Sequence, residues 1–382
     1  MDPRSLSPSE AYLKRAEGYA ASRSDLNRRS RLLGWVRTGA FIVAAGLFLA
    51  WDVSESALAA RYAAAGGLAF LLFVGLVALH RRVRREEEWF GLLEGLCAEG
   101  ESRLARDWED LPEDPDGPAP AEHPYAGDLS VVGENSLMQL LGSVATRPGR
   151  DRLRGWLLGL NHRPADSKTL LARQAAVAEL APRADFRDRF TGLGRLLEDP
   201  GQAVMARVAA WAAAPGGDAV VLWQVWLARV LPLLTLGLGW LEWTRPGPQR
   251  AWLVPLAVGM VLWWRVRDGI GALFKGAGVG ETALDAMGPL TLAAEGLDPE
   301  TPHLREVRAR FGTGDASASV GIRRLRFWTG IAESRRNQFY ALFNLVFLVD
   351  IHVAWGLERW RRVHGARVPG WLDGLAELDA LA

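Results

Sequence analysis

Residues 32–51 read LLGWVRTGAFIVAAGLFLAW, an apolar stretch that only Arg37 and Thr38 interrupt. Residues 63–79 read AAAGGLAFLLFVGLVAL and contain no polar or charged side chain. Each stretch approaches the roughly 20 apolar residues that a helix needs to cross a bilayer. Together they predict a transmembrane hairpin, although a pair of buried core helices is the alternative. We therefore expect an integral membrane protein built from helices.

Charges around this hairpin predict its orientation. The connecting residues 52–62 carry Asp52, Glu55 and Arg61, whereas the outer flanks are rich in arginine. Because cytoplasmic flanks attract positive charge, both ends of the hairpin are expected in the cytoplasm. The sequence thus predicts a multi-pass protein of the cell inner or plasma membrane, with its termini and its bulk in the cytoplasm. The flanking arginines are Arg28, Arg29, Arg31, Arg81, Arg82, Arg84 and Arg85.

A second hydrophobic pair lies further along the chain. Residues 219–243 are long enough to span but contain Gln224 and Arg229, and residues 251–264 reach only about 21 Å as a helix. Tryptophans lie near the ends of both runs, as is typical of membrane interfaces. We favour a second hairpin, with residues 244–249 as its external turn, over a soluble core pair. The tryptophans are Trp223, Trp226, Trp240, Trp243, Trp252, Trp263 and Trp264.

Composition limits the remaining possibilities. The chain of 382 residues has room for two or three domains, and its net charge of +1 creates no global field that would attract nucleic acid. Its single cysteine, Cys97, excludes an internal disulfide and a cysteine-based zinc site. The first 30 residues are polar and charged, so no cleavable signal peptide is expected.

Residues 123–197 are predicted to form amphipathic helices. Apolar residues recur at helical spacing over 137–144, stop at Pro148-Gly149, and resume over 153–160. A third apolar face over 170–180 closes at Ala181-Pro182. Strand signals are scarce, and Asp128–Val132 is the only good short candidate. The fold class is therefore expected to be all-α.

This region resembles the start of the core domain of MutS-type DNA mismatch-repair proteins, although a helical hairpin of another origin is the alternative. The resemblance implies a cytosolic helical core and names a scaffold, with no catalytic site. The first part of the motif matches at Asn135-Ser136-Leu137, Thr146, Gly149-Arg150, Leu153 and Trp156-Leu157. A following helix matches at Arg173, Gln174, Ala176, Val177, Glu179 and Leu180.

The last third of the chain strengthens this resemblance. Four segments resemble the returning helices of the MutS core and lever. They are residues 317–326, Arg335–Gln338, an apolar helix from Phe339 to Trp355, and residues 358–365. In membrane-bearing relatives, a P-loop ATPase domain follows such a segment. The chain stops at Ala382, where that domain would begin. We expect a truncated gene, a split protein, or a fragment that covers only the amino-terminal part.

The sequence contains no GxxxxGK[ST] motif. Phe274-Lys275-Gly276 lacks both the leading glycine spacing and the following hydroxyl, so a phosphate cradle and a magnesium site are not expected. Gly269–Gly280 is rich in glycine, but no strand precedes it, and a flexible exit from the membrane is the preferred interpretation. This chain alone is therefore predicted to be no enzyme and to need no cofactor.

Two further groups of residues could suggest a catalytic, metal-binding or nucleic-acid-binding site. Asp350 and His352 lie on an apolar helix with Asn344 and Glu358, but positions 350 and 352 point to different faces, and helix packing explains them better than catalysis or metal binding. The arginines at 147, 150, 152 and 154 fit a solvated helix face better than a nucleic-acid contact, because no aromatic residues alternate with them. No catalytic, cofactor-binding or metal-binding residue is assigned.

These observations lead to two hypotheses. The first is a membrane-anchored MutS-like core and lever module that relays motion from a P-loop ATPase, attached or encoded separately. The second is a membrane scaffold or signalling protein that uses the helical core for protein contacts only. The lipid bilayer is the expected partner, a homodimer is compatible with the sequence, and DNA binding is doubtful because no mismatch-reading domain precedes the core. The expected regions are 1–110 (amino-terminal helix and first hairpin), 111–122 (linker), 123–215 (MutS-core-like helices), 216–268 (second hairpin) and 269–382 (returning helices).

Overall fold

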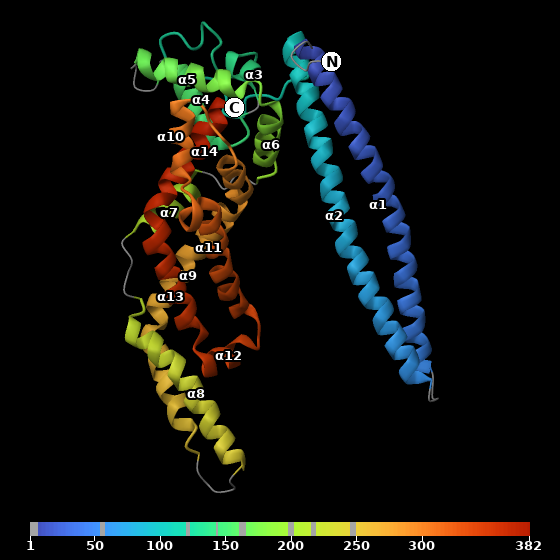
Figure 1. Cartoon of the computed structure of the whole chain (residues 1–382), viewed down its shortest axis with the longest axis vertical. Helices are drawn as coiled ribbons and strands as arrows, with labels where there is room; N and C mark the ends of the chain where they lie inside the picture. The colour runs from blue at the N-terminus through green and yellow to red at the C-terminus, as the bar shows by residue number, and fades with distance from the viewer. Residues whose placement is uncertain are drawn as a thin grey trace. The chain divides into compact units, whose positions relative to one another are not determined.

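A computed structural model describes residues 7–53, 58–119, 123–142, 144–159, 166–197, 202–214, 219–244 and 250–382. Within these ranges the chain is helical and contains no strand, which confirms the all-α prediction. It forms two compact units, Met1–Gly142 and Ser143–Ala382, coloured from blue to green and from green to red in Figure 1. Leu160 lies outside the described residues, as does all of the expected turn at 244–249 except Thr244.

Unit 1 is dominated by a long antiparallel helical hairpin. Helices α1 (Pro8–Val53) and α2 (Ala59–Ala105) contain 46 and 47 residues, about 70 Å each. Near the chain terminus they pack through Leu93 and Leu96 and are joined by an ion pair between Arg23 and Glu94 at 3.0 Å. Toward the turn, both helices are apolar and exposed, because only 6% of each apolar window is buried. The hairpin therefore changes from a polar, packed section to an apolar, unpacked one.

The rest of unit 1 is a compact set of turns. Asp128–Val132 forms turns, so the strand candidate is wrong; Ser130, at φ +45°, and Gly133, at φ +98°, reverse the chain there. Helix α3 (Leu137–Leu141) follows, and its Gln139 donates to the carbonyl of Leu111. Leu111 is buried, so the described part of the 111–122 stretch packs onto this unit.

Unit 2 is a helical assembly around one central helix, α9 (Leu253–Glu295). Helices α6, α7, α8, α11 and α13 all pack against α9. The core includes Ile270, Leu284, Phe311 and Trp371, which are fully buried. The surrounding helices are α4 (Arg147–Leu158), α5 (Ser167–Leu180), α6 (Ala184–Arg195), α7 (Gln202–Ala213), α8 (Leu222–Thr244), α10 (Pro302–Arg310), α11 (Ala318–Glu333), α12 (Tyr340–Phe347), α13 (Val349–His364) and α14 (Val368–Leu381), with short 3-10 turns at Gly314–Ala316, Ser334–Arg336 and Gly365–Arg367.

The glycine-rich stretch Gly269–Gly280 is part of helix α9, so the expected flexible exit is wrong. One glycine of this stretch, Gly276, makes room for a neighbouring side chain. A Cβ on Gly276 would lie only 2.2 Å from Trp211 Cδ1, and the Trp211 ring stacks on Trp360 at 5.8 Å. Helix α9 therefore runs without a break for 43 residues, about 64 Å.

In the part of the chain that the structure describes, three helices are long and apolar enough to cross a membrane: α1, α2 and α8. Helix α9, which contains most of the predicted second member of the second hairpin, is not among them. The predicted apolar helix Phe339–Trp355 is not one helix, because α12 and α13 are separated by a 79° bend. Leu348 forms the bend with φ +50°, a conformation that non-glycine residues seldom adopt. Counted together, the bent pair gives a fourth candidate span by length and composition.

Candidate functional site

The amino terminus of α4 is held by a carboxylate from the last helix of the chain. Thr146 caps α4, and its hydroxyl accepts the N–H of Gly149 at 3.2 Å. Thr146 also donates its own N–H and its hydroxyl to Asp379 Oδ2, at 2.8 and 2.5 Å. Asp379 is only 3% exposed, and burial raises its pKa to about 6, although the Thr146 donors, the Ala145 N–H and the charge of Arg150 favour the ionised form. The contact joins α4 to α14.

Gly149 makes this close approach sterically feasible. A Cβ at position 149 would lie 2.3 Å from Asp379 Oδ2, far inside van der Waals contact. Any larger side chain would therefore displace the Asp379 carboxylate. Gly149 and Thr146 both belong to the MutS-like motif, so two of its positions form one contact.

A second contact between α4 and α14 is ionic. Arg152 pairs with both Asp373 and Glu377. Burial alone would lower the pKa of Arg152, but hydrogen bonds and charge from Asp373 and Glu377 raise it overall, so the guanidinium stays charged. His303 of α10 lies 3.1 Å from Glu377 through Nε2. We call this set, Thr146, Gly149 and Arg152 against Asp373, Glu377 and Asp379, the α4–α14 clamp.

The two halves of the MutS-like motif touch beside the clamp. The Arg173 guanidinium of α5 lies 4.0 Å from the centre of the Trp156 ring, a cation–π contact. Arg173 also approaches Glu377, with Nε 3.9 Å from Oε1. Trp156 is only partly buried. The interpretation of the 147–154 arginines as a wholly solvated face is wrong for Arg152, which is ion-paired.

Glu179 anchors the far end of α5. Its carboxylate accepts the backbone N–H groups of Glu300 and Thr301 at 2.9 and 2.7 Å, and pairs with Arg183 at 2.9 Å. Burial alone would raise the pKa of Glu179, but these donors lower it overall. Thr301 caps α10, so the motif glutamate positions the loop between α9 and α10.

Sequence reasoning missed the acidic side of the clamp. Asp373 and Glu377 stand four positions apart on α14 and share one face of an otherwise apolar helix. Buried acids on an apolar helix normally have a partner, and this pattern was the available signal. The contacts of the clamp are those of a specific, charge-assisted connection between two helices.

A second polar cluster surrounds Asp350 at the α12–α13 bend. Asp350 is 1% exposed and accepts the Tyr340 hydroxyl at 2.7 Å, the Trp263 indole N–H at 2.9 Å and the Asn344 amide at 3.1 Å. Its backbone N–H donates to Asn344 Oδ1 at 2.9 Å, and Arg335 lies 3.3 Å away. We call these five residues the Asp350 centre. They line a cavity of about 300 Å³.

The candidate residues Asn344, Asp350, His352 and Glu358 do not form one site in the structure. Asn344 binds Asp350, whereas His352 lies against the backbone of Ala228 on α8. Glu358 pairs with Arg361 at 3.4 Å, and Arg361 also donates to the carbonyls of Trp211 and Ala214. Within the described ranges, no group of three or more His, Cys, Asp or Glu could hold a metal ion.

Comparisons of this chain with protein-family models, with curated proteins and with solved structures found no match. The MutS resemblance therefore remains a prediction from the motif residues. Among the motif residues, Thr146 contacts Gly149, and Arg173 contacts Trp156.

Proposed function

We propose that this protein is a membrane-anchored lever module, which couples the state of a P-loop ATPase at the α14 end of unit 2 to elements in the bilayer. The observation that carries the proposal is the α4–α14 clamp. Its buried Asp379 contact can be broken only at a substantial free-energy cost, so α14 and the motif helices have to move together.

Helix α9 supplies a physical route between the two ends. Its first part packs beside α8, an apolar helix whose exposed surface suits lipid, and its later part packs against α14. Figure 1 shows α9 extending along unit 2 between these regions. A continuous helix transmits displacement as a nearly rigid body, because its interior is close-packed. In this proposal α1 and α2 form a transmembrane hairpin, α8 spans the bilayer with the apolar first part of α9 beside it, and the clamp lies in the cytoplasm.

The chain is proposed to bind no nucleotide by itself and to act through its ATPase partner. A first test reads the nucleotides after codon 382, in the same and the neighbouring frames, for a P-loop motif. The second test purifies that ATPase with the chain in lipid nanodiscs and measures ATP hydrolysis. Coupling predicts that Asp379→Asn changes the hydrolysis rate several-fold, whereas Asp315→Asn, at an exposed ion pair with Arg324, leaves it unchanged.

Two results would contradict the proposal. One is the absence of any P-loop sequence in the gene and its neighbours. The other is a hydrolysis rate that is the same with the wild-type chain, with Asp379→Asn and without the chain. Either result would favour the membrane scaffold that uses the helical core for protein contacts only.

A further inference from the structure

Helix α12 has an apolar face that no described residue of unit 2 covers. Phe339, Leu342 and Phe343 are 60%, 63% and 58% exposed. The opposite face carries Tyr340 and Asn344, which both bind Asp350. The Asp350 centre therefore fixes the rotation of α12 about its own axis, with the polar side inward and the apolar side outward.

The bend at Leu348 sets the direction of α12. Helix α13 packs against α8 and α9 and extends toward the α14 end (Figure 1). Because α12 makes an angle of 79° with the helix that follows, it crosses this direction almost at right angles. If α8 spans the bilayer, α12 lies close to the membrane plane.

Two contacts set the level of α12 along α9. Asp350 accepts the Trp263 N–H, and Leu348 packs over Gly259, where an added Cβ would lie 3.4 Å from Leu348 Cδ1. Trp263 lies at the end of the apolar section of α9, directly before Arg265 and Arg267. The change from apolar to charged residues marks the membrane interface. Helix α12 therefore lies at that level.

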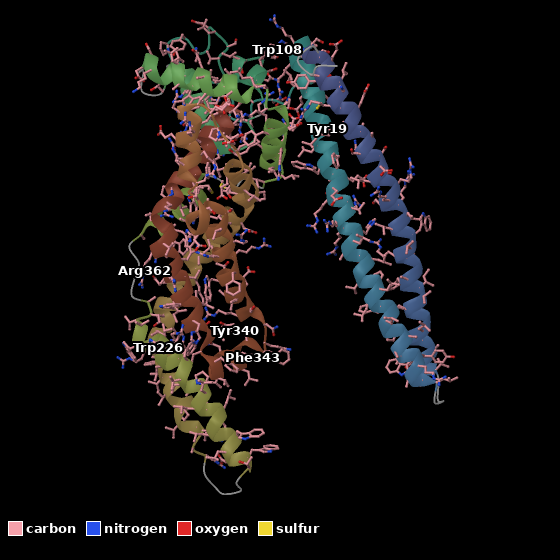
Figure 2. All side chains as sticks on the ribbon, viewed as in Figure 1. Tyr19, Trp108, Trp226, Tyr340, Phe343 and Arg362 are labelled. Atoms are coloured by element: carbon pink, nitrogen blue, oxygen red, sulfur yellow. The ribbon has the colours of Figure 1, made fainter. Side chains whose placement is uncertain are left out.

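The neighbouring surface has the same character. Trp226 of α8 is exposed, and Arg229 stacks on its ring at 5.2 Å, a pairing suited to the headgroup region. Figure 2 shows Trp226, Tyr340 and Phe343 at similar positions along unit 2, with Arg362 further toward the α14 end. The exposed polar residues Glu333, Ser334, Asn337 and Gln338 precede Phe339. The apolar face of α12 thus continues the lipid-facing surface of α8.

We propose that α12 is an interfacial helix that lies in the plane of the bilayer, on the side of the α14 end, with Phe339, Leu342 and Phe343 in the acyl-chain boundary. Such helices bury their apolar face about 5–10 Å into the interface. The partner is the lipid bilayer itself. This inference rests on one part of the proposed function, the insertion of α8, and does not depend on an ATPase.

Spin labelling tests this placement, because the chain has only one cysteine and Cys97 is replaced by alanine in the background. Single cysteines at Phe339→Cys, Leu342→Cys and Phe343→Cys are labelled in nanodiscs of phosphatidylcholine and phosphatidylglycerol. Accessibility to O2, which concentrates in hydrocarbon, is compared with accessibility to a water-soluble nickel chelate. The O2-to-nickel ratio should be several-fold higher at these positions than at Arg362→Cys on exposed α13.

Val346→Cys distinguishes an in-plane helix from a crossing one. Val346 lies seven positions after Phe339, about 10 Å along the helix axis and on nearly the same face. An in-plane helix predicts equal label depth at both positions, and a depth difference near 10 Å would overturn the proposal in favour of a broken span.

Leu236→Cys, on the exposed middle of α8, separates the two possible failures. If the Leu236→Cys label is in lipid but the α12 labels match Arg362→Cys, only the interfacial helix is wrong. If Leu236→Cys is itself in water, the membrane anchor fails and both proposals fall. Labels on α12 that are immobile and shielded from both O2 and nickel would reveal a protein partner, such as a second copy of the chain, and would also overturn the inference.

Discussion

Thr146 and Asp379 are 233 positions apart in the chain and form one buried contact, in which the threonine N–H and hydroxyl both donate to Asp379 Oδ2. The same hydroxyl accepts the N–H of Gly149 and so caps α4. Thr146 is therefore both a local helix cap and a long-range anchor. This double role explains why the start of α4 and the end of α14 form one structural unit.

Removal of the Asp379 carboxylate should destabilise unit 2. In Asp379→Ala, the Thr146 N–H and hydroxyl lose their acceptor in a buried site, which should cost about 2–4 kcal/mol of unfolding free energy. Chemical denaturation in detergent measures this value. Asp315→Asn, at an exposed ion pair with Arg324, is the control and should change it by less than about 0.5 kcal/mol. If Asp379→Ala lowers the free energy of unfolding by no more than this control does, the Asp379 contact does not stabilise unit 2.

The Trp156–Arg173 contact should be measurable as a coupling. Because Trp156 is partly buried, Trp156→Ala should cost about 1–3 kcal/mol, less than a fully buried tryptophan. A double-mutant cycle of Trp156→Leu with Arg173→Met should give a coupling of about 0.5–2 kcal/mol from the cation–π contact. Strictly additive effects of the two substitutions would mean that the stacking contributes no stability.

Glu179 should make stability depend on pH in the acidic range. Its pKa in the folded chain is lowered from the usual 4.5, so it stabilises the fold when ionised. That contribution is fully present above the unfolded pKa and is lost as pH falls through the folded pKa. Glu179→Gln should thus be less stable than the wild type at about pH 7, with the difference shrinking below about pH 4.5. A difference that stays constant from about pH 7 to about pH 3 would contradict this assignment.

Two glycines of α9 should respond in opposite ways to alanine. Gly276→Ala places a Cβ against Trp211 and displaces its ring from Trp360, which should cost about 1–3 kcal/mol. Gly271→Ala meets no atom within 4 Å and should be neutral or stabilising by up to about 1 kcal/mol, because alanine favours helices. Thermal midpoints of the two variants in the same detergent provide the comparison. Equal changes in the thermal midpoint would show that the close contact between Gly276 and Trp211 does not contribute to packing.

Local pattern determined the helical character of the chain. The apolar runs at 32–51 and 63–79 predicted long helices with lipid-compatible surfaces, and α1 and α2 contain them. Such features depend on residues within a few positions of one another, so periodicity and capping preferences reveal them. The break predicted at Pro148-Gly149 is misplaced, because α3 ends earlier, at Leu141, and both residues lie in the first turn of α4, which begins at Arg147.

Only the tertiary structure decided which residues meet. Gly276 looked like part of a flexible stretch, but Trp211 fills the space beside it, so the helix continues. Leu348 lies inside an apolar run that reads as one helix, yet the hydrogen bonds of Asp350 with Tyr340, Trp263 and Asn344 stabilise a bend there.

The clamp illustrates the same division. Thr146 and Gly149 were visible as motif residues, but their partner Asp379 could not be identified from the sequence, because contacts between distant segments depend on how all the intervening helices pack. The sequence by itself thus determined where helices form and which faces are apolar, since those properties are local. The three-dimensional packing determined which polar groups are buried together, because the free-energy cost of leaving a buried charge unpaired selects its partner only in the folded chain.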